Sequence, residues 1–185
     1  MAKNSYALIG RVLDASEAKS WEKAVDEWEI VGYVEDSSLT EACICGKENL
    51  RYLFTIRNII NGNILYPIGS SCIKKFEHDA LADELQCWQD YIRLKNKIRA
   101  TKSVALNSVY FTRRLLKFLY IKGAFRPNKY NGNDPRNDYE FMVDMFNKRD
   151  KSSLTQKQEA KVGILLRNIR LFVELFDPMD EPLEF

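Results

Sequence analysis

The 185-residue chain contains one histidine, His78, and eight glycines. A single histidine excludes every metal site that needs two, including the H-E-x-x-H motif, and no glycine-rich phosphate-binding loop is present. A Ser/His/Asp or Cys/His catalytic arrangement would have to use His78, and no nucleophile signature accompanies it. The sequence therefore offers little support for hydrolytic enzymes of these classes.

Long hydrophobic runs are also missing. No stretch approaches the roughly 20 apolar residues needed to span a bilayer, and the start of the chain, "MAKNSYALIG", is a poor match to a secretory signal. We therefore expect a cytoplasmic protein. Thiols stay reduced in the cytoplasm, so closely spaced cysteines there favour metal ligands or free thiols over disulfides.

Acidic residues are absent from residues 91–130, which carry eleven Lys and Arg. By contrast, residues 1–46 carry nine acidic and four basic residues. This asymmetry predicts a polyanion or an acidic protein surface as partner. Interleaved aromatics (Tyr110, Phe111 and Tyr120) suit RNA or single strands; the alternative is a solvated helix face with aromatics in the core. The candidate phosphate-binding residues are Arg93, Lys97, Arg99, Arg113, Arg114 and Lys117.

The N-terminal half mixes helical and strand patterns. Helical spacing of apolar residues predicts a helix over about 15–28, followed by a short strand in "EIVGYVED". The run "LRYLFTIRNII" alternates, and "ILYPIG" follows it after the turn signal Asn61-Gly62-Asn63, so the two runs predict a β-hairpin. Pro67 places the second run at a sheet edge or at a strand end.

The rest of the chain is predicted to be helical. Helices are expected from Ser70 or Ser71, from Asp79 to about residue 100, over 104–121 ending at Gly123, and in two further segments near 138–149 and 155–176. The predicted fold class is α+β, with a treble-clef-like knuckle and a β-hairpin embedded in a mostly helical protein. We divide it into a cysteine-bearing module over 1–78 and a helical region over 79–185.

Three cysteines flank the predicted hairpin. A C-x-C-G corner (Cys43, Cys45), a hairpin and a helix with Cys72 in its first turn follow the layout of treble-clef zinc sites, and Zn²⁺ binds four N or S ligands. His78 supplies the fourth ligand if the helix breaks near 76–79; water or a partner is the alternative. Two other interpretations stay open, namely buried thiols without metal and a disulfide. Cys87, beside a tryptophan on an apolar helix face, is predicted to be a core residue.

Several segments resemble small proteins of phages and other mobile elements of Gram-positive bacteria. They are "WEKAVDEWEIV", "CICGKENLRYLFTIRN", "NGNILYPIGSSCIKKF" and "NDYEFMVDMFNKR", and the G-S-x-C-I-x-K-F block is the most specific of them. The resemblance implies a mobile-element accessory protein with a zinc-finger-like core, acting in the cytoplasm of a bacterial host. Some such proteins disarm host defences, so it further implies RNA or a ribonucleoprotein as partner, with an anti-CRISPR inhibitor of a Cas effector and its guide as the most concrete form.

A nuclease or RNA-processing factor is the alternative function. Such an enzyme can bind its metal through carboxylates and needs no histidine. Acidic residues at the start of a helix are more often explained by capping and helix-dipole preferences. The candidate carboxylates are Asp134, Asp138, Glu140 and Asp144.

Overall fold

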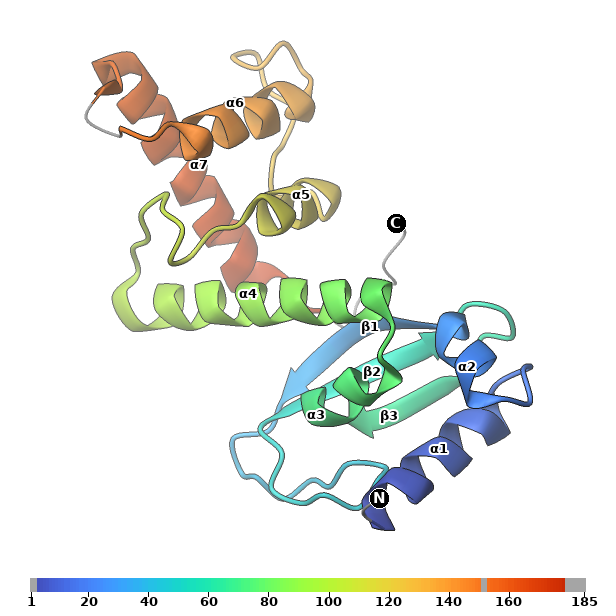
Figure 1. Cartoon of the computed structure of the whole chain (residues 1–185). Coiled ribbons are helices and arrows are strands. Elements are labelled where there is room, and N and C mark those ends of the chain that lie inside the picture. The colour runs from blue at the N-terminus through green and yellow to red at the C-terminus, as the bar shows by residue number, and fades with distance from the viewer. Residues whose placement is uncertain (1–2, 151–152, 179–185) are drawn as a thin grey trace. The chain divides into compact units, whose positions relative to one another are not determined.

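The structure is a computed structural model that describes residues 3–150 and 153–178. It confirms the α+β class: seven α-helices accompany one three-stranded antiparallel sheet in this part of the chain (Figure 1). Residues 3–86 and 177–178 form one compact unit, and Cys87–Phe176 form a second. The division falls within a helix, later than the predicted boundary at residue 78. No helix in the described residues has the length and apolarity needed to cross a membrane.

The first unit begins with two helices that differ from the prediction. Helix α1 (Lys3–Ala15) buries Leu8 and Val12, whereas the predicted helix over 15–28 shrinks to α2 (Trp21–Ala24) and a 3-10 turn, η1 (Val25–Glu27). The reason is the buried carboxylate of Glu27. It accepts hydrogen bonds from the backbone amides of Glu17 and Ala18, at 2.9 and 2.7 Å, so the chain before α2 wraps around it as a loop.

The sheet has the order β1-β2-β3, formed by β1 (Trp28–Glu35), β2 (Tyr52–Asn58) and β3 (Ile64–Ile68). Strands β2 and β3 pair as the predicted hairpin, and β3, which contains Pro67, is an edge strand as expected. Thr55 in β2 is only 3% exposed although it alternates with the apolar residues Phe54 and Ile56, so both faces of the strand are buried there. Helix α3 packs against β2, and α1 packs against β3. The helices therefore cover more of the sheet than the alternation of apolar and polar residues along β2 suggests.

A short helical segment leads from the sheet to the long helix. Helix α3 (Ser70–Ile73) continues into the 3-10 turn η2 (Lys74–Phe76), with Gly69 rather than a serine at its N-cap. Glu77 then adopts a left-handed conformation (φ +50°), which interrupts the helix before α4 (Asp79–Thr101) begins. The helix is thus interrupted near 76–79, which was the condition for His78 to reach the cysteines.

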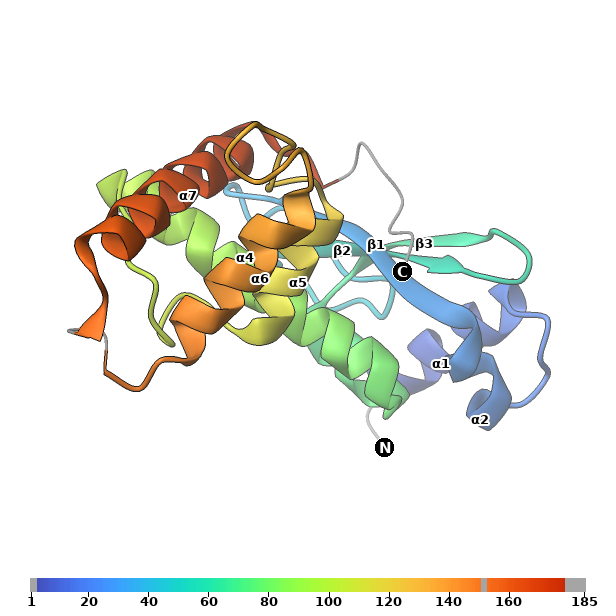
Figure 2. The same ribbon diagram turned by 90° about the horizontal axis from the view of Figure 1, so that it is seen from above.

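The second unit consists of most of α4 with α5 (Arg113–Ile121), α6 (Pro135–Asn147) and α7 (Gln156–Leu175). Helices α5 and α6 pack side by side (Figure 2). The predicted helix over 104–121 starts only at residue 113, because Thr112 acts as its N-cap and accepts the Leu115 amide. Cys87 is buried, in agreement with its predicted core role. Gly123, at φ +81°, follows α5 as predicted.

Candidate metal centre

Two of the predicted ligands, Cys43 and Cys45, lie in a tight corner before β2. The Gly46 amide donates to the Cys43 carbonyl at 2.7 Å, and the Cys43 amide donates to the Lys47 carbonyl at 2.8 Å. Gly46 has φ +85°, a conformation that glycine adopts without the steric cost other residues meet. The Ile44 amide donates to the carbonyl of Pro67 at 2.9 Å and so ties the corner to β3.

The third ligand, Cys72, lies on the short helix α3 immediately after the hairpin. Its amide donates to the Gly69 carbonyl at 2.8 Å, and the Gly69 amide points back to the Cys43 sulfur at 3.4 Å. A Cβ atom on Gly69 would stand 3.3 Å from two methyl carbons of Leu50. Glycine at this position therefore leaves room for the Leu50 side chain beside the corner.

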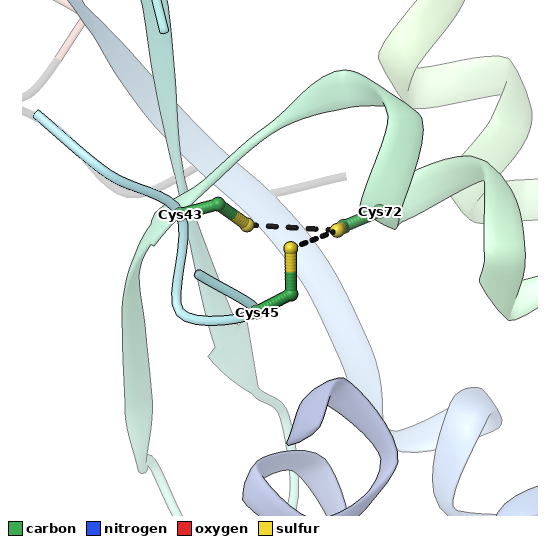
Figure 3. A group of neighbouring side chains, drawn as sticks. All are labelled: Cys43, Cys45 and Cys72. Atoms are coloured by element: carbon green, nitrogen blue, oxygen red, sulfur yellow. Dashed lines mark hydrogen bonds between the residues drawn. The ribbon is translucent and has the colours of Figure 1, made fainter. Parts of the chain in front are cut away.

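The three sulfur atoms meet in the interior of the first unit (Figure 3). The Cys72 sulfur is 3.5 Å from that of Cys43 and 3.1 Å from that of Cys45, and all three lie within 4.8 Å of one another. Each residue is at most 5% exposed. These distances are well above the ~2.05 Å of a disulfide, and all three are free cysteines.

This donor set fits a metal ion. Four sulfurs around a tetrahedral ion at about 2.3 Å are separated from one another by about 3.8 Å. The sulfur pairs at 3.1 and 3.5 Å would therefore move apart by about 0.7 and 0.3 Å to accept one. Among the described residues this is the only group of three or more Cys, His, Asp or Glu side chains close enough to hold a metal.

Protonation within the cluster favours one thiolate. The hydrogen bond with the Cys72 thiol lowers the pKa of Cys43 to about 5, against the effect of burial, and the amides of Cys45 and Gly69 contribute. The pKa of Cys72 is raised by its hydrogen bond with Cys43 and by burial. A cation bound at the centre would stabilise the thiolate form of all three, because metal ligation releases thiol protons.

The predicted fourth ligand, His78, does not join the three sulfurs. Its Nε2 lies 3.2 Å from a carboxylate oxygen of Asp26, and its Nδ1 accepts the Leu81 amide at 3.4 Å. The helix break that was expected to bring His78 to the cysteines instead places it at the start of α4. A pocket of about 180 Å³ beside the cluster is lined by Cys43 and Cys72, together with Lys47, Arg51, Ser70 and Ser71 among others.

The four carboxylates considered for a nuclease site form no metal-binding group in the described part of the chain. Asp134 caps α6 by accepting the Arg136 amide, and Glu140 pairs with the Arg136 side chain at 2.7 Å. Asp138 is buried and accepts from Lys161 Nζ at 2.8 Å. Asp144 is exposed on the same helix.

The predicted phosphate-binding residues all lie in the second unit, on two helices. Arg93, Lys97 and Arg99 are on α4, and Arg113, Arg114 and Lys117 are on α5; all are exposed except Lys97, which is half-buried. The buried carboxylate of Asp90 accepts from Arg93 Nη1 at 3.2 Å and from the Thr112 hydroxyl at 3.0 Å. It thereby connects the basic face of α4 to the N-cap residue of α5.

The aromatic residues interleaved with these cations mostly pack against other residues of the protein and are not exposed for base stacking. Phe111 is buried, the Tyr120 ring stacks on Tyr139 at 4.8 Å, and Lys97 Nζ lies over the Tyr110 ring at 5.4 Å. At least some of these aromatic residues therefore pack in the core, as the alternative interpretation of the basic segment expected. Tyr130, in the loop before α6, is 83% exposed.

Charge is divided between the two units. Residues 87–176 contain nineteen Lys and Arg against eight Asp and Glu, a net charge of +11, while the rest of the chain contains nine against eighteen, a net charge of −9. Arg167 and Arg170 on α7 belong to this excess but lie outside the predicted basic segment. Their spacing of three along an amphipathic helix was the available signal in the sequence.

Comparisons with protein-family models, with curated proteins and with solved structures gave no match. The interpretation of this chain therefore depends on its own residues: a buried cluster of three thiols in one unit and a concentration of cations in the other.

Proposed function

We propose that the chain is a zinc-stabilised, non-enzymatic protein that binds nucleic acid or a nucleoprotein through its second unit. The observation that carries the proposal is the net charge of +11 on residues 87–176. Clustered cations bind phosphates and release the counterions around them, which gives affinity without base recognition. The first unit, with its opposite charge, is repelled by the same ligand and contributes the metal centre instead.

Zinc is the metal that this centre fits best. Thiolate ligands select zinc, copper(I) and iron–sulfur clusters, and a corner, a hairpin and a helix N-terminus together supply ligands in many structural zinc sites. Cys43, Cys45 and Cys72 would hold the ion. Water, or a group from a partner entering through the adjacent 180 Å³ pocket, would complete the coordination. When bound, the ion fixes the corner, the hairpin and α3 to one another.

Phosphate contacts are proposed to come from the exposed cations of α4 and α5. Arg113 uses its Nε to donate to the Asn147 side chain at 2.8 Å, which leaves the other guanidinium donors of the fork for a ligand. Because Phe111 and Tyr120 are engaged in packing, base stacking has a smaller part than the sequence suggested. The binding is accordingly expected to depend on backbone charge more than on sequence.

Binding of labelled RNA and single-stranded DNA across a salt series tests this proposal. We expect the logarithm of affinity to fall linearly with the logarithm of salt concentration, with a slope set by the number of phosphates contacted. Arg113→Glu with Arg114→Glu should weaken binding at least tenfold and flatten the slope. Lys19→Glu with Lys23→Glu, an equal charge change in the first unit, is the matched control. Salt-independent binding, or equal loss in both variants, would refute the proposal.

The ribonucleoprotein we propose to test first is a Cas effector loaded with guide RNA, in keeping with a mobile-element accessory role. Purified protein is added to the effector with and without magnesium, and DNA cleavage and guide integrity are measured together. Loss of cleavage with intact guide supports an anti-CRISPR binding role. Shortened guide would favour an RNA-processing enzyme, and unaffected cleavage would remove this effector from consideration.

A further inference from the structure

A pocket in the second unit has the composition of an anion site. It measures about 240 Å³ and lies between the end of α4 and one face of α7. Its volume is below the ~300–1,000 Å³ typical of drug-sized ligands, so it suits a small group. Three of its lining residues are cationic and none is acidic; the lining residues are Lys102, Ser103, Val104, Gly163, Leu166, Arg167 and Arg170.

Arg170 is the best-placed donor in this pocket. Its Nη1 donates to the Lys102 carbonyl at 3.2 Å, which holds the guanidinium in one orientation and covers a carbonyl at the C-terminal end of α4. Its Nε is buried and has no hydrogen-bond partner. A buried donor without a partner is unfavourable, and an acceptor oxygen that reached it would remove that penalty.

The floor of the pocket is open because of a glycine. Gly163 lies on the same face of α7 as Arg167 and Arg170, four and seven residues before them, and a Cβ atom added to it would meet nothing within 4 Å. Glycine inside a helix is unfavourable relative to alanine. Its effect here is to leave room beside two arginines.

The opposing charge near the pocket is limited. Glu174 Oε1 lies 3.5 Å from Lys102 Nζ, and the Lys102 side chain is 67% exposed. Exposed ion pairs of this kind contribute little to stability, so an anion can displace Glu174 from Lys102 easily. Arg167 is exposed, and none of the residues that line the pocket is acidic.

We propose that this pocket binds a phosphate group, supplied by the end of a nucleic-acid strand. The source of the phosphate rests on the proposed nucleic-acid binding, whereas the pocket's preference for a small tetrahedral anion follows from its own residues. Arg170 and Arg167 present fork-shaped donors that match phosphate oxygens, and Lys102 adds a third charge. A terminal phosphate is favoured over an internal one because it carries the greater charge.

The pocket itself is tested with inorganic phosphate, titrated into the full chain and followed by amide chemical shifts. We expect saturable shifts for residues around α7 and the end of α4. Arg170→Gln and Gly163→Leu, which remove a donor and fill the floor, should each weaken binding at least tenfold. Gly163→Ala and Arg149→Gln, an exposed arginine elsewhere in the unit, should change it less than twofold. Unsaturable shifts, or equal weakening in all four variants, would overturn the proposal, and melting temperatures show whether each variant folds.

The source of the phosphate is tested with one oligoribonucleotide carrying a 5′-phosphate, a 3′-phosphate or hydroxyls at both ends. Tighter binding of a phosphorylated end, lost in Arg170→Gln, supports the proposal. Equal affinity for all three would overturn the strand-end assignment even if inorganic phosphate binds. RNA binding without any phosphate binding would refute this inference and leave the proposed function standing. Phosphate binding without RNA binding would refute the proposed function and the strand-end assignment, and would leave only a pocket for a small anion.

Discussion

Glu84 makes the stability of the first unit depend on pH in a direction opposite to that of most carboxylates. The side chain lies on α4, and its Oε2 accepts the Ile30 amide at 2.7 Å, where the pairing of β1 with β2 shifts register. Burial raises the pKa of Glu84 to about 7; the hydrogen bond from Ile30 opposes this rise and the charge of Glu29 adds to it.

The sign and size of the effect follow from linkage. The pKa of about 7 in the folded state is above the ordinary pKa of 4.5. Between pH 4.5 and pH 7, the folded state therefore keeps a proton on Glu84 that the unfolded state has lost. The contribution to stability is complete below pH 4.5 and is lost as pH rises through 7. At 1.36 kcal/mol per pKa unit, the free energy of unfolding should fall by about 2.5 kcal/mol between pH 5 and pH 8 from this residue alone.

Urea unfolding at pH 5 and pH 8 measures the effect, with Trp88→Phe as background so that the fluorescence of Trp21 and Trp28 reports on the first unit. Glu84→Gln keeps an oxygen for the Ile30 amide and cannot ionise, so its change with pH should be smaller than that of the background protein by about 2.5 kcal/mol. The thiol cluster is common to both proteins and cancels in the difference.

Glu22→Gln, an exposed glutamate on α2, is the control and should follow the background protein. If Glu84→Gln shows the same pH dependence as Glu22→Gln, the buried carboxylate is ionised throughout and the reasoning fails.

Three further predictions concern the metal and the helical unit. Protein prepared without chelator should contain about one zinc per chain by elemental analysis. Cys72→Ser should remove the zinc and lower the melting temperature, whereas Cys87→Ser should keep the zinc. Wild-type protein that is stable without zinc would contradict the metal centre. Asp138→Asn should destabilise the chain by about 1–3 kcal/mol in thermal unfolding, because it deprives Lys161 of its carboxylate in a buried setting, and it should leave RNA binding intact. Thr155→Ala should cost about 1 kcal/mol by removing the capping box of α7, and an unchanged melting temperature would show that this cap carries no stability.

The hairpin and the thiol cluster were predictable because their signals are local. The turn residues between β2 and β3, the proline on the edge strand and the cysteines on either side of the hairpin lie within 30 residues, from Cys43 to Cys72. Once the hairpin forms, its two ends lie side by side, and this brings the corner before β2 close to α3, which follows β3. Geometry of this short range can be read from sequence spacing.

The helix predicted over 15–28 failed because distant residues decide it. Asn58, at the end of β2, donates its amide Nδ2 to the Glu27 carboxylate at 2.6 Å, and Trp28 donates its ring N–H to the Ser16 hydroxyl at 3.0 Å. Both interactions need β1 and β2 to be in place. The fourth ligand failed for a similar reason, since Asp26 competes for His78 and no local pattern shows their proximity.

The separation of charge between the units affects how copies of the chain associate with one another. A net charge of +2 suggests a nearly neutral particle, yet each molecule carries a strongly basic and a strongly acidic part. At 0.01 M salt, where the screening length is about 30 Å, the basic part of one copy attracts the acidic part of the next, whereas at 0.15 M it shortens to about 8 Å and the attraction fades. Concentrated solutions should therefore turn cloudy on dialysis into water and clear again on addition of sodium chloride.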